Sequence, residues 1–110
     1  MEPLQLFKCL SDQTRLNCTF LIYKAGEICV CDLVDILGES QPKISRHLAQ
    51  LRRCGLLIDT KREQWVYYSI NPKLPKWAKK ILEETLQINT SHFLKLGKKI
   101  KILTKNINCC

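Results

Sequence analysis

The sequence predicts a mainly α-helical protein with a β-hairpin: a dimeric winged helix-turn-helix that ends in a long C-terminal dimerisation helix. The first observation behind this prediction is a short helix followed, after a few residues, by a second capped helix. The second is a pair of β-prone runs directly after that helix, and the third is a long segment with heptad spacing. At 110 residues the chain is expected to form one domain.

The charge of the chain is strongly basic and unevenly distributed. Residues 1–42 carry three basic and six acidic side chains, whereas residues 43–62 carry six basic side chains and one acidic one. Residues 63–110 carry nine lysines and three glutamates, and the whole chain has a net charge of +8. This balance favours a polyanionic partner for the central stretch.

The N-terminal third is predicted to hold three helices. Residues 3–10 form a short first helix, and a second over about 12–24 is expected to begin at the N-cap Ser11 and to end at Gly26. Residues 29–37 form a third, short helix. This helix opens a helix-turn-helix unit over about residues 29–54.

The second helix of that unit is predicted to begin at Ser40 and to end at Gly55. Three apolar residues recur at i, i+4 and i+7 and should face the core, namely Ile44, Leu48 and Leu51. At about 100° per residue, Arg46 points away from them. A solvated amphipathic helix would show the same pattern, but the position between a short helix and a basic hairpin favours DNA binding.

The residue types on the outward face suit both phosphates and base edges. Arginine pairs with guanine and glutamine with adenine in the major groove, and recognition helices touch DNA mainly through their first turns. The candidate contacts on this helix are Ser40, Gln41, Lys43, Ser45, Arg46 and Gln50.

A wing is predicted over about residues 56–70, as two β-prone runs that flank residues 61–64. The connection lacks the glycine usual in tight hairpins. Lys61 and Arg62 are placed at its tip, from which they could reach an adjacent minor groove or the DNA backbone.

The last helix is predicted to run from about 75 to 104 and to be followed by a cysteine tail over 105–110. Apolar residues spaced alternately by four and three form a heptad seam, with one polar member that could fix the register. The seam predicts a two-fold dimer, and the alternative is packing on the N-terminal helix of the same chain. The seam residues are Leu82, Leu86, Asn89, Phe93, Leu96, Ile100 and Leu103.

The seven cysteines do not resemble a secreted disulfide scaffold, because their number is odd and long helical patterns dominate. No apolar run is long enough to span a bilayer, and the N-terminus shows no secretory signal. We therefore expect a cytoplasmic protein, without membrane contact, whose cysteines are thiols. Cys9, Cys18 and Cys54 are interpreted as packing residues.

Cys29 and Cys31 are the clearest chemical signal, since two thiolates one residue apart suit a soft ion. In a regular helix, however, residues i and i+2 point about 200° apart. Both could bind one ion only if the helix start were unwound, so binding would distort the first helix of the helix-turn-helix. The alternative is that one or both are small buried hydrophobic residues.

Three segments together resemble the ArsR/SmtB family of bacterial metal-responsive repressors, and most closely its arsenic-responsive branch: ICVCDL, SQPKISRHLAQLRRCGLL and WVYYSINPKLPKWAKKIL. The resemblance covers the chain from Leu4 to about Ile81. It implies a dimeric repressor that binds a palindromic operator and leaves it when an inducer binds. It also implies that Cys29 and Cys31 are the inducer-binding residues.

The resemblance also matches the positions of a recognition helix, which are Gln41, Lys43, Ser45, Arg46 and His47. His47 lies within the helix expected to face DNA, so a DNA contact is favoured over metal binding there. Zinc-sensing members carry carboxylate and histidine ligands on the last helix. Here that helix has only His92, without a suitably spaced carboxylate, so the sequence argues against such a site.

The sequence departs from the arsenic-responsive pattern at one position. Many members have a third cysteine three residues after the second, where this chain has Val34. Either two thiols suffice, or a small thiol completes the site, or Cys109 or Cys110 supplies the third sulfur.

The leading hypothesis is an arsenite-responsive repressor, with As(III) or Sb(III) as inducer, operator DNA and a second copy as partners, and no catalytic cofactor. One alternative keeps the repressor and changes the inducer to antimonite, cadmium or lead. Another is a thiol-based metal-binding or redox protein whose basic surface is incidental. An enzyme is not expected, because no nucleophile–base pair or paired carboxylates stand out.

Overall fold

The computed structural model describes the backbone of residues 1–104 and the side chains of residues 1–100. The elements in chain order are α1 (Pro3–Leu10), α2 (Gln13–Ala25), β1 (Glu27–Cys29), α3 (Val30–Leu37), α4 (Gln41–Arg53), β2 (Leu57–Arg62), β3 (Trp65–Ile70), α5 (Lys76–Leu86) and α6 (Ser91–Thr104). The predicted tail, with Cys109 and Cys110, lies outside the described residues. The winged helix-turn-helix is confirmed, with α3 and α4 as its helices and β2 and β3 as its wing.

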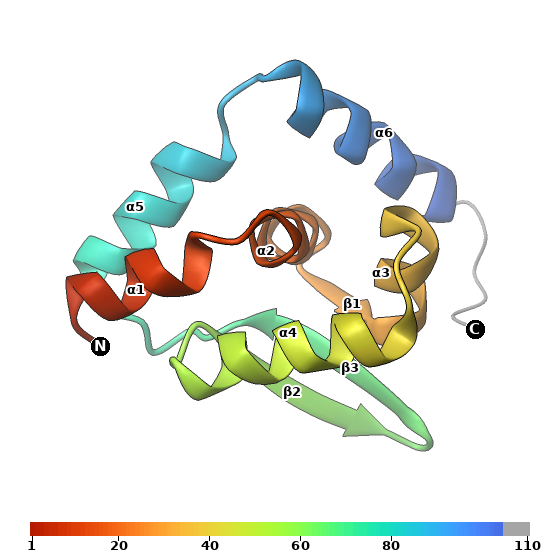
Figure 1. Ribbon diagram of the computed structural model, residues 1–110, viewed down its shortest axis with the longest axis horizontal. Coiled ribbons are helices and arrows are strands. Elements are labelled where there is room, and N and C mark those ends of the chain that lie inside the picture. The colour runs from red at the N-terminus through yellow and green to blue at the C-terminus, as the bar shows by residue number, and fades with distance from the viewer. Residues whose placement is uncertain (105–110) are drawn as a thin grey trace.

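Helix α2 is the centre of the fold (Figure 1). It packs against α1, α3, α4 and α6 and against strands β1 and β3. Five consecutive residues of α2 are buried, from Cys18 to Ile22, so this helix is enclosed on most of its circumference. Helix α4 and the wing lie on one side of α2, and α5 and α6 on the other.

The second helix begins one residue later than predicted, because Asp12 and not Ser11 is its N-cap. Asp12 has extended backbone angles, and its carboxylate accepts a hydrogen bond from the backbone amide of Arg15 at 3.1 Å. Ser11 instead closes α1, where its hydroxyl donates to the carbonyl of Lys8 at 2.8 Å. The predicted stop at Gly26 is confirmed, with a φ of 81° that favours glycine.

A strand stands where the third helix was predicted to begin. Residues Glu27–Cys29 form β1, which pairs antiparallel with β3, so the sheet has the order β1-β3-β2. Helix α3 therefore begins at Val30, and Cys29 is both the last strand residue and the helix N-cap. A strand of three residues is too short for an alternating pattern to show in the sequence.

The hairpin is confirmed, but its turn is shorter than predicted. Strand β2 extends through Arg62, which pairs with Trp65, so only Glu63 and Gln64 remain in the turn. Glu63 has a φ of 57°, a conformation that two-residue hairpin turns usually give to glycine or asparagine. Lys61 and Arg62 consequently belong to the end of a strand and not to the tip.

The predicted single helix over 75–104 is wrong, because the chain breaks it between Leu86 and Ser91. Thr90 starts the second piece: its hydroxyl accepts from the amide of Phe93 at 3.2 Å, and its carbonyl accepts from the amide of Leu94. Asn89, the expected register-fixing residue of a continuous seam, lies in the connection.

The apolar seam residues whose side chains the structure describes are buried in their own chain, namely Leu82, Leu86, Phe93, Leu96 and Ile100. Helix α6 packs on α2, with the rings of Phe20 and Phe93 stacked at a centroid distance of 4.2 Å. The structure thus shows that these residues pack within the chain, on α2 in the case of α6, and their role as a dimer seam stays a prediction.

Replacing Asp12 by alanine is expected to lower the free energy of unfolding by about 1 kcal/mol, because the Arg15 amide loses its acceptor. Asp12→Asn keeps an acceptor and should lose less. The hydrogen bond from the Arg15 amide, assisted by the charges of His47 and Arg15 against an opposing effect of burial, lowers the pKa of the Asp12 carboxyl. The stability from its charge is thus present above the ordinary value of 3.8 and is lost as the pH falls through the lowered one.

Urea unfolding between about pH 7 and about pH 2 measures both effects, since the advantage of the wild type over Asp12→Asn should vanish at the acid end. Ser11→Ala is the matched control, with an expected change within about 0.5 kcal/mol. A larger loss for Ser11→Ala than for Asp12→Ala would contradict this assignment of the cap.

Candidate nucleic-acid interface and thiol site

Helix α4 is anchored by its apolar face and capped at its start. Ile44, Leu48 and Leu51 are each fully buried, as the spacing predicted. The hydroxyl of Ser40 accepts from the amide of Lys43 at 3.4 Å, and a proline occupies the first turn. Burial fixes the rotation of the helix about its axis and so decides which side chains face solvent.

The first turns of α4 present polar side chains to solvent. Ser40, Gln41 and Arg46 are exposed, and Ser45 is half-buried. Lys43 forms an ion pair with Glu39, with Nζ and Oε2 3.0 Å apart. The predicted DNA-contacting residues in the N-terminal half of this helix are therefore exposed or partly exposed to solvent.

The residues predicted farther along α4 are held by the N-terminal end of α2. The guanidinium of Arg15 donates to Oε1 of Gln50 at 2.7 Å and lies 3.4 Å from Nδ1 of His47. Asp12 is 3.8 Å from the same His47 nitrogen, and the His47 side chain is only 11% exposed. His47 and Gln50 are therefore engaged within the chain.

Arg15 was missed by the sequence analysis because its partners lie on other elements. Besides Gln50, its guanidinium donates to the carbonyls of Cys9 at 2.8 Å and Lys8 at 3.2 Å, at the end of α1. One side chain thus joins the end of α1, the start of α2 and the outer face of α4. No periodicity within a single element signals such a contact.

Ion pairs also occupy basic groups of the wing. Arg62 pairs with Glu27 through both terminal guanidinium nitrogens, with Nη2 and Oε2 2.9 Å apart, and lies 5.1 Å from the centre of the Tyr67 ring. Arg52 at the end of α4 pairs with Asp59 of β2 at 3.1 Å. Lys61 is exposed.

Cys29 and Cys31 lie on either side of the junction between β1 and α3. Cys29 is 2% exposed and sits opposite Tyr67 in the sheet, and Cys31 is half-buried in the first turn of α3. The backbone at Cys29 is extended, with φ −88° and ψ 161°. The chain is therefore not helical at Cys29. The two cysteines are not held about 200° apart, as residues i and i+2 of a regular helix would be.

The donor set at this junction is small. Within residues 1–100, no three histidine, cysteine or acidic side chains are grouped so that they could hold a metal ion. After reduction, Cys29 and Cys31 can supply two sulfur donors, and Val34, one turn farther along α3, packs half-buried against the core. Two thiolates suit a soft thiophilic ion better than a hard cation.

The expectation that every cysteine is a thiol is wrong: Cys9 and Cys54 form a disulfide with each other, and Cys29 and Cys31 are disulfide-bonded as well. Cys9 lies near the end of α1, and Cys54 directly follows α4. Cys18 is fully buried, as predicted, and burial, with a smaller contribution from Asp12, raises the pKa of its thiol to about 12.

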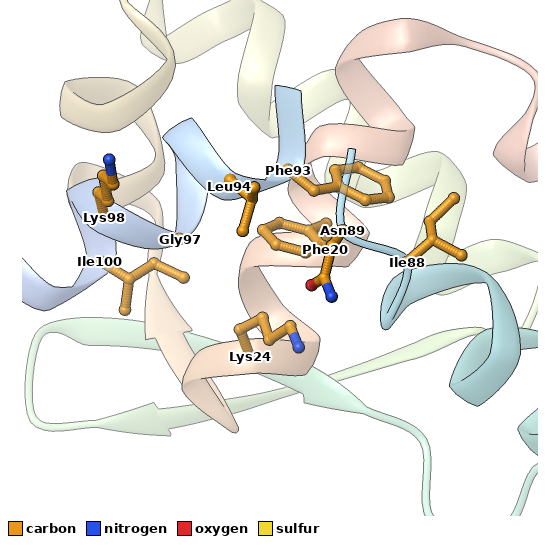
Figure 2. A pocket seen from close by; sticks show the side chains of 9 residues that line it. All are labelled: Phe20, Lys24, Ile88, Asn89, Phe93, Leu94, Gly97, Lys98 and Ile100. Carbon is orange, nitrogen blue, oxygen red and sulfur yellow. The ribbon is translucent and has the colours of Figure 1, made fainter. Parts of the chain in front are cut away.

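A cavity of about 400 Å³ opens between α2, α6 and the segment that joins α5 to α6 (Figure 2). The rings of Phe20 and Phe93 line it, with the lysine side chains of Lys24 and Lys98 also part of its lining. Its lining holds neither a cysteine nor an acidic residue. Among the described residues, none of the helices is both long and apolar enough to cross a membrane.

Comparison with known proteins agrees with this geometry. Residues 12–59 match the family described as "Bacterial regulatory protein, arsR family". The chain is 56% identical over 90 residues to the arsenic resistance transcriptional regulator ArsR2 of Pseudomonas putida KT2440, covering 82% of this chain and 78% of that one. It is also 56% identical over 82 residues to the arsenical resistance operon repressor of Escherichia coli K12, covering 74% and 70%.

Among solved structures, HlyU from Vibrio cholerae N16961 superposes with a TM-score of 0.67 at 30% identity, covering 77% of this chain and 94% of that one. Strong similarity thus extends well beyond the helix-turn-helix itself.

Arg15→Ala is expected to lower the free energy of unfolding by about 1–3 kcal/mol, because it removes charge-assisted hydrogen bonds that join three helices. Arg15→Lys should recover only part of the loss, since an ammonium cannot reproduce the planar geometry of the guanidinium. Chemical denaturation of each variant gives the values.

Arg46→Ala is the matched control, because this exposed arginine should change stability by less than about 0.5 kcal/mol. Equal stability of Arg15→Ala and the wild type would show that the Arg15 contacts do not hold the helices together.

Proposed function

Because the chain belongs to the ArsR family of bacterial regulatory proteins, we propose that it is a homodimeric repressor that releases a palindromic operator when As(III) binds Cys29 and Cys31. That it is a DNA-binding transcriptional regulator and not an enzyme follows from the family. The inducer, the dimer and the operator symmetry are the parts that we propose.

The observation that supports an inducer site most directly is the position of Cys29. It ends a strand paired with the wing strand β3 and caps the first helix of the helix-turn-helix. Helix α3 in turn packs against α4. A ligand held by Cys29 and Cys31 therefore acts where the wing and the two helices meet.

The chemistry of the junction fits trivalent arsenic. As(III) in water carries hydroxyl groups that thiols displace, and two cysteine sulfurs leave one position for hydroxide or for a small thiol. A thiol at Val34 is not required for this arrangement. Binding would restrict the backbone that now joins β1 to α3, and the altered start of α3 would shift its packing on α4.

The proposed DNA surface consists of the exposed start of α4 and the end of the wing. Arg46 and Gln41 would reach base edges or phosphates, and Lys61 would contact the backbone beside the helix. His47 and Gln50 would act indirectly, by holding α4 against α2. Lys43 and Arg62 would exchange carboxylate partners for phosphates.

The proposed dimer would use apolar side chains that the fold leaves outside. Leu4 and Phe7 of α1 are 65% and 51% exposed, and Leu94 of α6 is 51% exposed. A two-fold arrangement would present two copies of α4 to successive major grooves, about 10 base pairs apart. Such symmetry is the basis for proposing a palindromic operator.

Arg46→Ala is expected to weaken operator binding by about 1–3 kcal/mol, because an exposed guanidinium at the start of the recognition helix is lost. The measurement is fluorescence anisotropy on a duplex that the protein selects from a random pool, over a series of salt concentrations. Lys80→Ala on α5 removes the same charge far from this surface and serves as the control. Equal weakening by both changes would contradict this placement of the DNA surface.

Arsenite is expected to reduce operator affinity of the wild type by roughly 5- to 150-fold, and to leave Cys29→Ser and Cys31→Ser bound. A phosphine reductant is needed, because thiol reductants would compete for arsenite. Cys18→Ala is the control, since this buried cysteine belongs to α2 and not to the segment that joins β1 to α3, and this variant should still respond.

Antimonite, cadmium and lead titrated in the same assay test the alternative inducers. If one of these ions releases the operator and arsenite does not, the protein is still a repressor, but its inducer is that ion and not arsenite. If none releases the wild type, the proposed sensing site is wrong.

A further inference from the structure

We propose that Cys9 and Cys54 form a reversible thiol–disulfide switch that fastens α1 to the end of the recognition helix α4. This would be a second input to the repressor, separate from Cys29 and Cys31. The two cysteines are 45 residues apart in sequence, and the fold joins them.

The pair is positioned by contacts that do not depend on the disulfide. The amide of Gln5 donates to the carbonyl of Cys54 at 3.1 Å, and Arg15 donates to the carbonyl of Cys9 at 2.8 Å. The side chain of Leu6 is fully buried between these contacts. Reduced protein would therefore still hold the two sulfurs near each other, which is what rapid and reversible oxidation requires.

The solvent exposure of the two sulfurs indicates which of them reacts first. Cys54 is 8% exposed and its sulfur lies 3.2 Å from the carbonyl oxygen of Leu51, whereas Cys9 is half-buried. The more accessible Cys9 thiolate would attack a low-molecular-weight disulfide such as glutathione disulfide and release one glutathione. Cys54 would then attack the mixed disulfide and release the second glutathione. Two thiols are oxidised to one disulfide, and glutathione disulfide is reduced to two thiols.

Cys18 gives a contrast within the same molecule. It is fully buried, and burial raises the pKa of its thiol to about 12, so it holds almost no thiolate at neutral pH. Thiol–disulfide exchange is thus expected at the Cys9–Cys54 pair and not at Cys18.

The disulfide matters because α1 is only eight residues long. Isolated helices of that length are marginal in water, so α1 depends on its attachment to the rest of the fold. The helix exposes Leu4 and Phe7, which belong to the proposed dimer surface. Fastening α1 to α4 would hold this surface rigidly against the DNA-reading helix and so favour the operator-bound dimer. This last step rests on the proposed function.

The test uses the full chain with Cys29, Cys31, Cys109 and Cys110 each changed to serine, which leaves the pair and Cys18. Treatment with glutathione disulfide is expected to remove two thiols and two hydrogen atoms, as read by thiol labelling and mass spectrometry. The melting temperature should rise by on the order of 10 °C, and operator affinity by roughly 5-fold, both reversed by a reductant.

Two further changes in the same background serve as controls. Cys9→Ser should abolish every effect of oxidation, whereas Cys18→Ala should retain them all. Persistence of all three thiols, or addition of two glutathiones without an internal bond, would overturn the switch. Oxidation that raises the melting temperature but leaves operator affinity unchanged would overturn its coupling to DNA.

The result that contradicts the proposed function differs from the results that contradict the switch. Absence of sequence-specific DNA binding in both redox states would contradict the repressor, while the thiol count and the melting temperature would still decide whether the pair is reversible.

Discussion

The burial of one face of α4 against α2, α3 and β2 is the interaction on which the rest of the structure depends. Ile44, Leu48 and Leu51 are fully buried. Each such side chain contributes roughly 1.5–3 kcal/mol relative to exposure, so together they outweigh any single polar contact on the surface. Because this burial fixes the helix rotation, it also decides that Arg46 faces outward.

The junction at Cys29 connects this helix to the sheet. Strand β1 is only three residues long, yet it ties the start of α3 to β3, and β3 carries the wing through β2. A change at the junction therefore has two routes to the DNA surface, through α3 to α4 and through β3 to the wing. The short strand, absent from the sequence prediction, makes the thiol site part of both.

The features that were predicted correctly depend on residues close together in sequence. The N-cap at Ser40, the stop at Gly26 and the buried stripe of α4 each follow from a local pattern, and each is confirmed. The cap at Asp12 was misplaced by one residue, because Ser11 and Asp12 are both good caps and only the backbone angles distinguish them.

The break between α5 and α6 shows why the C-terminal prediction failed. Leu82, Leu86 and Phe93 keep a spacing compatible with a continuous heptad even though the chain leaves the helix between them. The spacing of apolar residues along the sequence is the same whether the helix continues or a turn interrupts it. The adjacent Asn89 and Thr90 were a usable signal, since such residues favour helix starts over helix interiors. The Arg15 contacts and the Cys9–Cys54 pair had no comparable signal, because they join elements far apart in sequence.

The cations of the proposed DNA surface and Arg15 behind it differ in the partners that they have. Lys43 and Arg62 have partly exposed carboxylate partners, and such surface pairs contribute only about 0–1 kcal/mol. They can exchange partners for phosphates at little cost, with release of the counterions that phosphates hold. Arg15 instead donates to backbone carbonyls and to Gln50, and withdrawing it would break the hydrogen bonds that join the end of α1 and α4 to the start of α2. The first set is therefore suited to contact DNA, and Arg15 to keep the helix that does so in place.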